Sequence, residues 1–134
     1  MRVLTVPLLA LALGALASSP VTPAHSQPAQ CGRVASGSGA ATALVLAAIA
    51  GQSFHLCGWD VTATATATFQ LIQGTGATCG TNTVNITAAH ALSPSSVIST
   101  MGSPGRYSLP ANTSLCIAIT GTGPVQWTVY YTQF

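Results

Sequence analysis

The sequence predicts an all-β protein, an antiparallel β-sandwich of about eight strands with jelly-roll connectivity as one way to close its two sheets. Short apolar or β-branched runs alternate with clusters of Gly, Pro, Asn and Ser, a pattern typical of strands joined by turns. The runs recur at roughly the spacing that antiparallel sandwiches need. No segment of the mature part has the length, caps and charge pairs of a convincing helix. Together these observations indicate the all-β class.

Nine segments are predicted to be strands. The clearest is the last, where Val125, Trp127 and Val129 alternate with polar residues in the period-two pattern of a half-buried strand, so Trp127 is expected in the core. The Ala-rich segment 40–50 also has helix propensity, but it is only a turn or two long and a strand is expected there. The predicted strands lie near residues 33–37, 42–48, 53–61, 65–73, 83–88, 97–100, 105–109, 114–120 and 125–132.

The first 26 residues are predicted to be a secretory signal peptide. Arg2 supplies a positive start, and the apolar segment 3–17 is too short and too interrupted by proline to span a bilayer comfortably. A small-x-small cleavage site occurs at residues 24–26, with cleavage near 17–19 as the alternative. The product is therefore expected to be exported, either secreted or held in the periplasm or at the cell surface.

The mature chain is expected to hold one domain. Residues 27–32 form a short N-terminal spacer, and residues 33–134 form a single β-sandwich. No later segment is long and apolar enough to be a membrane helix, so no membrane insertion is expected after signal cleavage. The remaining 134 − 26 = 108 residues suffice for a core, although such small domains often add covalent crosslinks.

Four cysteines fall in the mature part: Cys31, Cys57, Cys79 and Cys116. An even count in an exported domain favours two disulfides, and the absence of a C-x-x-C pair argues against a zinc site or a redox motif. Four cysteines allow three connectivities. We expect Cys79 to pair with Cys116, a loop cysteine with a strand cysteine, which leaves Cys31 to tie the N-terminal segment to Cys57.

Charge is nearly absent from the mature chain. There is no Lys and no Glu, and Arg33, Arg106 and Asp60 are its only fully ionised side chains, which gives 2 − 1 = +1. Binding to nucleic acid or to an anionic membrane needs many more cations, so neither partner is expected. Because net charge is a main brake on association and 49% of the residues are hydrophobic, a surface buried against other copies is expected.

The chain offers little material for catalysis. General acid–base chemistry needs titratable side chains in contact, and only Asp60, His55 and His90 are available besides cysteine, so no catalytic residue, metal or cofactor is expected. A blue-copper site would need His or Met shortly after Cys116, and a hydrolase elbow would need G-x-S-x-G; neither pattern occurs. His55 is expected on the strand face that carries Cys57 and Trp59, and His90 in the loop 89–96.

Two surface patterns suggest binding. Threonines at every second position from 62 to 68 could form a row of hydroxyls like one row of an ice-binding array, although solvent-facing strand threonines or a turn within the run explain them better. Trp59, Tyr107 and Tyr130 are candidate ligand-binding residues that could stack on a surface glycan. Trp127 and Tyr131 have core parity and are left out of this group.

Several motifs recur together. The segment 46–59 is an apolar run, an Ala-Gly turn and a strand that ends in Gly-Trp, and the pieces 73–81, 114–117 and 125–131 follow in order. Together they cover about residues 31–134 and resemble a group of small jelly-roll proteins from phage and prophage structural gene clusters, with exported bacterial relatives. The resemblance implies a sandwich that assembles into trimers or larger arrays, and it transfers no catalytic residue.

The function expected from the sequence is that of an exported, non-enzymatic structural or interaction protein that assembles with itself into a homo-oligomer, a trimer or larger. The alternative is a carbohydrate-binding module that uses exposed aromatic rings. A small hydrolase is the third reading. Coplanar exposed rings would favour the glycan reading, and exposed apolar patches would favour self-assembly.

Overall fold

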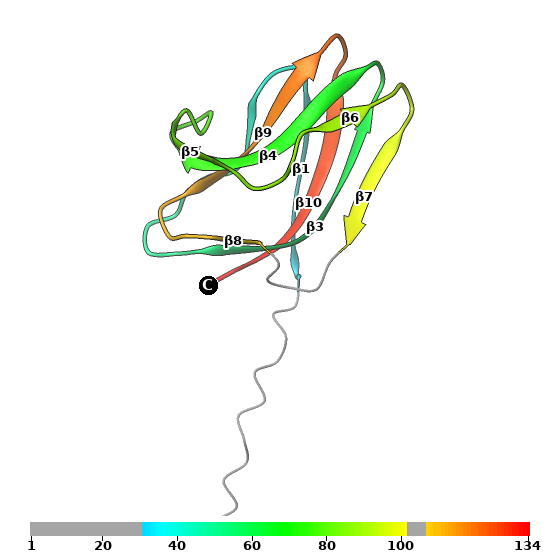
Figure 1. Cartoon of the computed structure of the whole chain (residues 1–134). Coiled ribbons are helices and arrows are strands. Elements are labelled where there is room, and N and C mark those ends of the chain that lie inside the picture. Colours follow the sequence, from blue (N-terminus) through cyan, green and yellow to red (C-terminus); the bar gives the residue numbers. More distant parts are fainter. Residues whose placement is uncertain (1–30, 102–106) are drawn as a thin grey trace, which may run out of the picture.

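Two five-stranded antiparallel sheets pack face to face in the computed structural model, which describes residues 31–101 and 107–134 (Figure 1). Sheet A has the order β1 (Arg33–Gly39), β10 (Val125–Gln133), β3 (Phe54–Ala63) and β7 (Val97–Met101), and β8 (Tyr107–Leu109) also pairs with β3. Sheet B has the order β2 (Ala43–Leu46), β9 (Ser114–Gly121), β4 (Ala67–Thr75) and β5 (Thr81–Asn85), and β6 (His90–Leu92) also pairs with β4. The all-β sandwich is therefore confirmed.

The strand pairings nest along the chain. β1 pairs with β10 and β2 with β9, while β3 pairs with β7 and β8, and β4 pairs with β5 and β6. The first four strands thus pair with later strands, β5 to β10. Consecutive strands switch between the two sheets, except that β4, β5 and β6 all lie in sheet B and β7 and β8 both lie in sheet A. Within the described residues there is no helix long and apolar enough to cross a membrane.

The core lies between the sheets and follows the expected alternation in β10. Val125 and Val129 are fully buried and Trp127 is 6% exposed, which confirms the parity predicted for this strand. Gly37 on β1 is paired with Trp127, and a Cβ atom there would lie 2.6 Å from the indole Cζ2. Glycine is therefore required at Gly37 so that the large ring can pack beneath the edge strand.

A β-bulge in β3 overturns the predicted face of His55. The register pairs Leu56 with Tyr131 and Gly58 with Tyr130, so Cys57 is an extra residue in β3. Phe54 and Leu56 are buried before the bulge, whereas Trp59 and Val61 are buried after it. Because a bulge shifts the alternation by one residue, His55 and Trp59 point to opposite faces, and the expectation that they share one was wrong.

Every predicted strand is present, with bounds shifted by a few residues, and one strand was missed. Residues 89–96 were expected to form a loop, but His90 begins the short strand β6, and its ring stacks on Phe69 with 5.1 Å between centroids. Three residues are too few to show a periodic pattern. The threonine run is broken at 64–66, where the chain leaves β3 in sheet A and enters β4 in sheet B, so the reading of a turn within the run is confirmed.

Both expected disulfides are present, and no described cysteine is free. Cys31 joins Cys57 across 26 residues, which ties the segment before β1 to the bulge in β3. Cys79 joins Cys116 across 37 residues, which ties the loop after β4 to β9. In the chain-entropy model, loops of this size stabilise the fold by about 3 to 4 kcal/mol each. Such bonds persist in an oxidising, extracytoplasmic environment.

Some expectations concern residues outside the described ranges. The predicted signal peptide, most of the spacer and Arg106 belong to this group.

Candidate functional site

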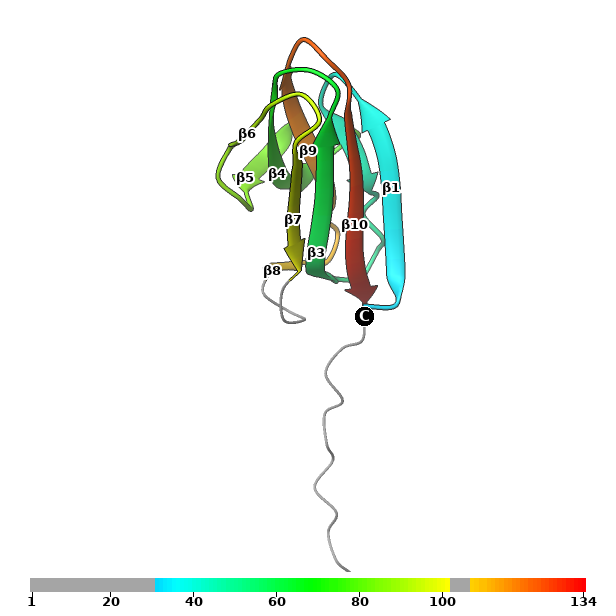
Figure 2. The same ribbon diagram turned by 90° about the vertical axis from the view of Figure 1, so that its right-hand side faces the viewer.

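The outer face of sheet A carries a row of polar side chains that are brought together by cross-strand register. Ser36 on β1 is paired with Thr128 on β10, Thr128 with Asp60 on β3, and Asp60 with Ser99 on β7. We call Ser36, Thr128, Asp60 and Ser99 the polar row. Residues in register across strands point to the same face, so the row crosses four of the five strands of sheet A. Figure 2 shows these four strands side by side, with β1 outermost.

Asp60, the only acidic residue of the chain, lies within this row and is held by two hydroxyls. Ser99 donates to Oδ1 at 2.5 Å and Tyr130 donates to Oδ2 at 2.9 Å. Tyr130 is opposite Gly58, which has no side chain, so the phenol has room to reach along the strands to Asp60. At the far end of the row, the hydroxyls of Ser36 and Thr128 are 3.1 Å apart.

Asp60 shifts the pKa of the tyrosine beside it. The pKa of Tyr130 is raised above its ordinary value of 10.0, mainly because its O–H donates to the Asp60 carboxylate, and also because of desolvation and the nearby negative charge. A carboxylate has about four acceptor positions, so Asp60 can still accept from a ligand. The row therefore presents one oriented anion among neutral hydroxyls.

A shallow groove of about 480 Å³ includes three members of the polar row, Ser36, Asp60 and Thr128. Its lining is almost entirely small or polar: Ser36, Gly37, Ser38, Asp60, Thr62, Gln126, Trp127 and Thr128. Hydroxyl, amide and carboxylate groups can exchange hydrogen bonds with a neutral polar molecule, whereas a charged ligand would find only one counter-charge.

The three aromatic residues proposed for glycan stacking do not form one platform. Trp59 is 4% exposed and belongs to the core, which corrects the expectation that it is available to a ligand, and its buried indole N–H has no hydrogen-bond partner. Half-buried Tyr107 packs against Trp59, with 5.8 Å between ring centroids, and lines a second pocket of about 240 Å³. Only Tyr130 lies on the outer face of sheet A.

The two histidines and Asp60 also lie apart from one another. His55 on β3 packs against Phe134, with 4.6 Å between ring centroids, whereas His90 stacks on Phe69 in sheet B. Asp60 contacts neither histidine. All described cysteines are in disulfides, so a copper-ligating thiolate is absent from them, and no group of three possible metal ligands occurs among the described residues.

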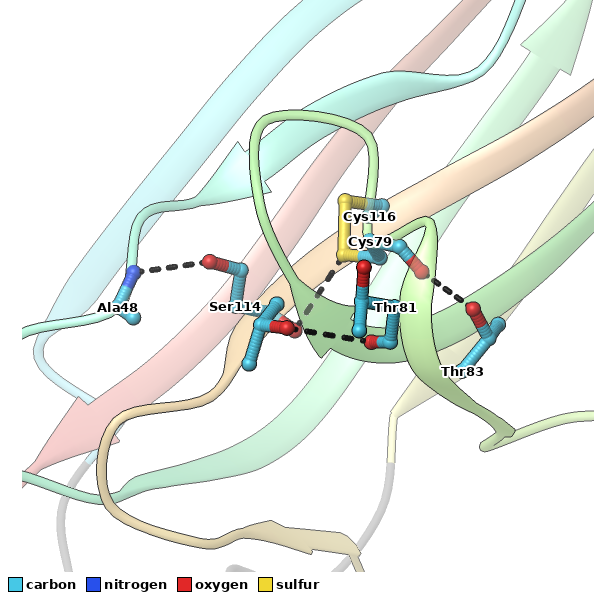
Figure 3. Close-up of a disulfide and its surroundings, with 7 residues drawn as sticks. Ala48, Cys79, Thr81, Thr83, Ser114 and Cys116 are labelled. Atoms are coloured by element: carbon cyan, nitrogen blue, oxygen red, sulfur yellow. Dashed lines mark hydrogen bonds between the residues drawn. A yellow bond between two sulfur atoms is a disulfide. The ribbon is translucent and has the colours of Figure 1, made fainter.

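The loop between β4 and β5 covers part of the outer face of sheet B. Cys79, in the loop between β4 and β5, is bonded to Cys116 on β9 (Figure 3). With Ile72 the two cysteines form a small buried cluster on that face. Thr83 donates a hydrogen bond to the Cys79 carbonyl. A Cβ atom on Gly74 would lie 2.5 Å from the Cys79 carbonyl oxygen, so glycine allows the loop to fold back onto its own strand.

The sequence analysis singled out Asp60 and Tyr130 but missed Ser36, Ser99 and Thr128. Their only sequence signal is a polar residue at an outward strand position, and such positions are common. No protein-family model, curated protein or solved structure matches this chain.

Proposed function

We propose that this protein is an exported, non-enzymatic β-sandwich that associates with itself and acts through its surface. The observation that carries the proposal is the combination of a nearly uncharged surface with exposed hydrophobic side chains. Among the described residues only Arg33 and Asp60 are fully ionised, and each is hydrogen-bonded within the chain. At the same time six large hydrophobic side chains are 41% to 62% exposed: Val34, Leu44, Ile49, Val84, Val97 and Phe134.

Scattered exposed hydrophobic residues are ordinary on a protein surface. Here they coincide with a surface that has almost no charge, and net charge is what normally keeps small domains apart. Val34 and Val97 lie on sheet A and Leu44 and Val84 on sheet B, so both sheets offer apolar contact. Two sheets with open edges add backbone groups that can pair with another chain.

Export and jelly-roll connectivity are part of the same proposal. The two disulfides support an oxidising destination. The nested strand pairing supports a jelly roll, since such a fold is a pair of Greek keys in two sheets. Both features agree with the resemblance to phage-derived structural proteins and their exported relatives, whose assembly the proposal extends to this chain.

Light scattering on the purified mature chain over a range of concentrations tests this function. We expect an oligomer at about 100 μM, well above the micromolar range in which modest interfaces form. The mass should change little with added salt, because few charges take part. A strictly monomeric protein at that concentration would overturn the proposal.

A second candidate function, binding of a neutral carbohydrate, is favoured by one observation, the polar lining of the groove beside Asp60. Sugar hydroxyls both donate and accept hydrogen bonds, which suits a carboxylate among hydroxyls and an amide. Calorimetric titration with neutral oligosaccharides tests it. Asp60→Asn should weaken binding about tenfold or more, whereas Ser108→Ala, at the exposed position of β8, should leave it unchanged. Equal affinities of the Asp60→Asn variant and the wild type would show that the groove is not the binding site.

A further inference from the structure

The free edge of β1 differs from every other edge of the sandwich. β1 has seven residues, and its register with β10 runs without a break. The other outer strands are shorter, with three to five residues, and β2 and β5 contain register shifts as well. Shortness and bulges are devices that prevent strand edges from pairing with other chains. β1 lacks them.

β1 also lacks the charges and prolines that usually protect an edge. Its sequence is Arg-Val-Ala-Ser-Gly-Ser-Gly, and its one charge lies at the first residue, where Arg33 donates to the Gln133 side chain at 2.7 Å. Val34, Ser36 and Ser38 are all exposed. In Figure 2 no strand lies beyond β1 on that side of sheet A. Its outer backbone N–H and C=O groups are therefore open to another strand.

We propose that β1 pairs antiparallel with β1 of a second copy about a two-fold axis at Ser36, which joins two A sheets into one continuous sheet. The inference rests on the proposed function, because it names the partner and the contact of the self-association. Ser36 is the midpoint of 33–39, so this register is the one that pairs all seven residues. Alternate pairs exchange two hydrogen bonds each, which makes about six to eight new backbone bonds.

In the proposed pairing, the residues of one β1 strand are compatible in charge and in size with the residues that they face on the other. The symmetric register places Arg33 opposite Gly39 of the second copy, and the two Arg33 side chains are offset by six residues, about 20 Å along the strands. That distance exceeds the Debye length of about 8 Å at physiological salt, so the like charges are screened. Val34, now 57% exposed, faces Ser38 of the second copy, and the two Ser36 hydroxyls meet at the axis.

A second copy fits this edge better than a charged peptide would. Apart from Arg33 the edge offers no group to select a charged partner, and an unblocked strand recognises chiefly another extended strand. A strand-edge contact is smaller than a standard protein interface, so it should be of modest affinity. It makes a two-fold dimer, and therefore favours an even-numbered assembly over the trimer that the phage resemblance implies.

Cysteine crosslinking tests the register. On the two-fold axis the Cβ atoms of paired residues are about 4.5 to 5.5 Å apart, close to what a disulfide needs. Ser38 of one copy is offset from Ser38 of the other by four residues, about 13 Å. Ser36→Cys should therefore form a covalent dimer on mild oxidation at about 100 μM, and Ser38→Cys, on the same face of the same strand, should form at least about fivefold less.

The outcomes separate the inference from the function on which it rests. A monomeric wild-type protein would overturn self-association altogether. An oligomeric wild type in which Ser36→Cys crosslinks no better than Ser38→Cys would overturn the β1 contact alone. Peptide mapping of the two native disulfides and equal melting temperatures establish that both variants fold.

Charge complementation supplies a second test that needs no new cysteine. Ser36→Lys and Ser36→Glu should each weaken the dimer, because two like charges would meet at the axis. Mixing the two variants should restore it as a mixed dimer. Ser108→Lys, an exposed position on the opposite edge strand β8, should keep the wild-type mass. A dimer unaffected by Ser36→Lys would overturn the contact.

Discussion

Sheets A and B have five strands each, yet their outer faces are built differently. The loop between β4 and β5 folds back over sheet B and is held there by Cys79–Cys116. The outer face of sheet A carries the polar row and a shallow groove, and it ends in the longest unbroken edge strand. A chain with almost no charge thus covers part of one outer face with its own loop and leaves the other outer face open to contact.

The largest expected effect is a loss of stability, and it should differ between the inner and outer faces of sheet A. Trp127→Ala should cost about 3 to 5 kcal/mol of unfolding free energy, because it empties a large volume in the core. Tyr130→Ala, three residues away on the outer face, should cost much less. Thermal or denaturant unfolding of both variants measures this. Equal losses would mean that the outer face also carries the stability of the sheet.

The covering of sheet B is tested by removing its disulfide. Replacing Cys79 and Cys116 by serine should lower the unfolding free energy by about 3 to 4 kcal/mol and should expose the cluster around Ile72 to an apolar dye. Replacing Cys31 and Cys57 by serine is the matched control, since that bond closes a loop of similar size away from sheet B. Equal dye binding by both variants would contradict a covering role of the loop.

The polar row makes a smaller, pH-dependent contribution. The raised pKa of Tyr130 means that its hydrogen bond to Asp60 stabilises the folded state below pH 10. This stability should be lost as the pH rises through the folded pKa. Asp60→Asn should bring the pKa of Tyr130 back toward 10. The titration is followed by tyrosinate absorbance, with the Tyr130→Phe variant as the reference. An unchanged titration would show that Asp60 and Tyr130 are not hydrogen-bonded to each other in solution.

The smallest effect is expected from the titratable groups taken together. His55 and Asp60 lie in sheet A and His90 in sheet B, without contact among them. Replacing the three by Ala, Asn and Ala should leave the oligomer mass unchanged, as measured by light scattering, provided that the melting temperature shows a folded protein. Loss of assembly in a folded triple variant would place one of these groups in the interface.

Much of the architecture follows from local chemistry. Trp127 was assigned to the core from the alternation of β10, because each side chain of a regular strand points opposite to its neighbour. The same rule failed in β3, where the bulge at Cys57 reversed the parity and moved Trp59 from a candidate binding surface into the core. Nothing in the residue types around Cys57 signals an extra residue, because the bulge depends on the pairing with β10.

The sequence by itself determined the class of this protein: an all-β sandwich with two disulfides, hardly any charge and few titratable groups. Only the tertiary structure decided which residues meet. Ser36, Thr128, Asp60 and Ser99 come from four strands between residues 36 and 128, and their neighbourhood depends on a register that no local pattern specifies. Likewise, β1 is an edge strand only because β10 pairs with one of its sides and nothing in the described chain pairs with the other.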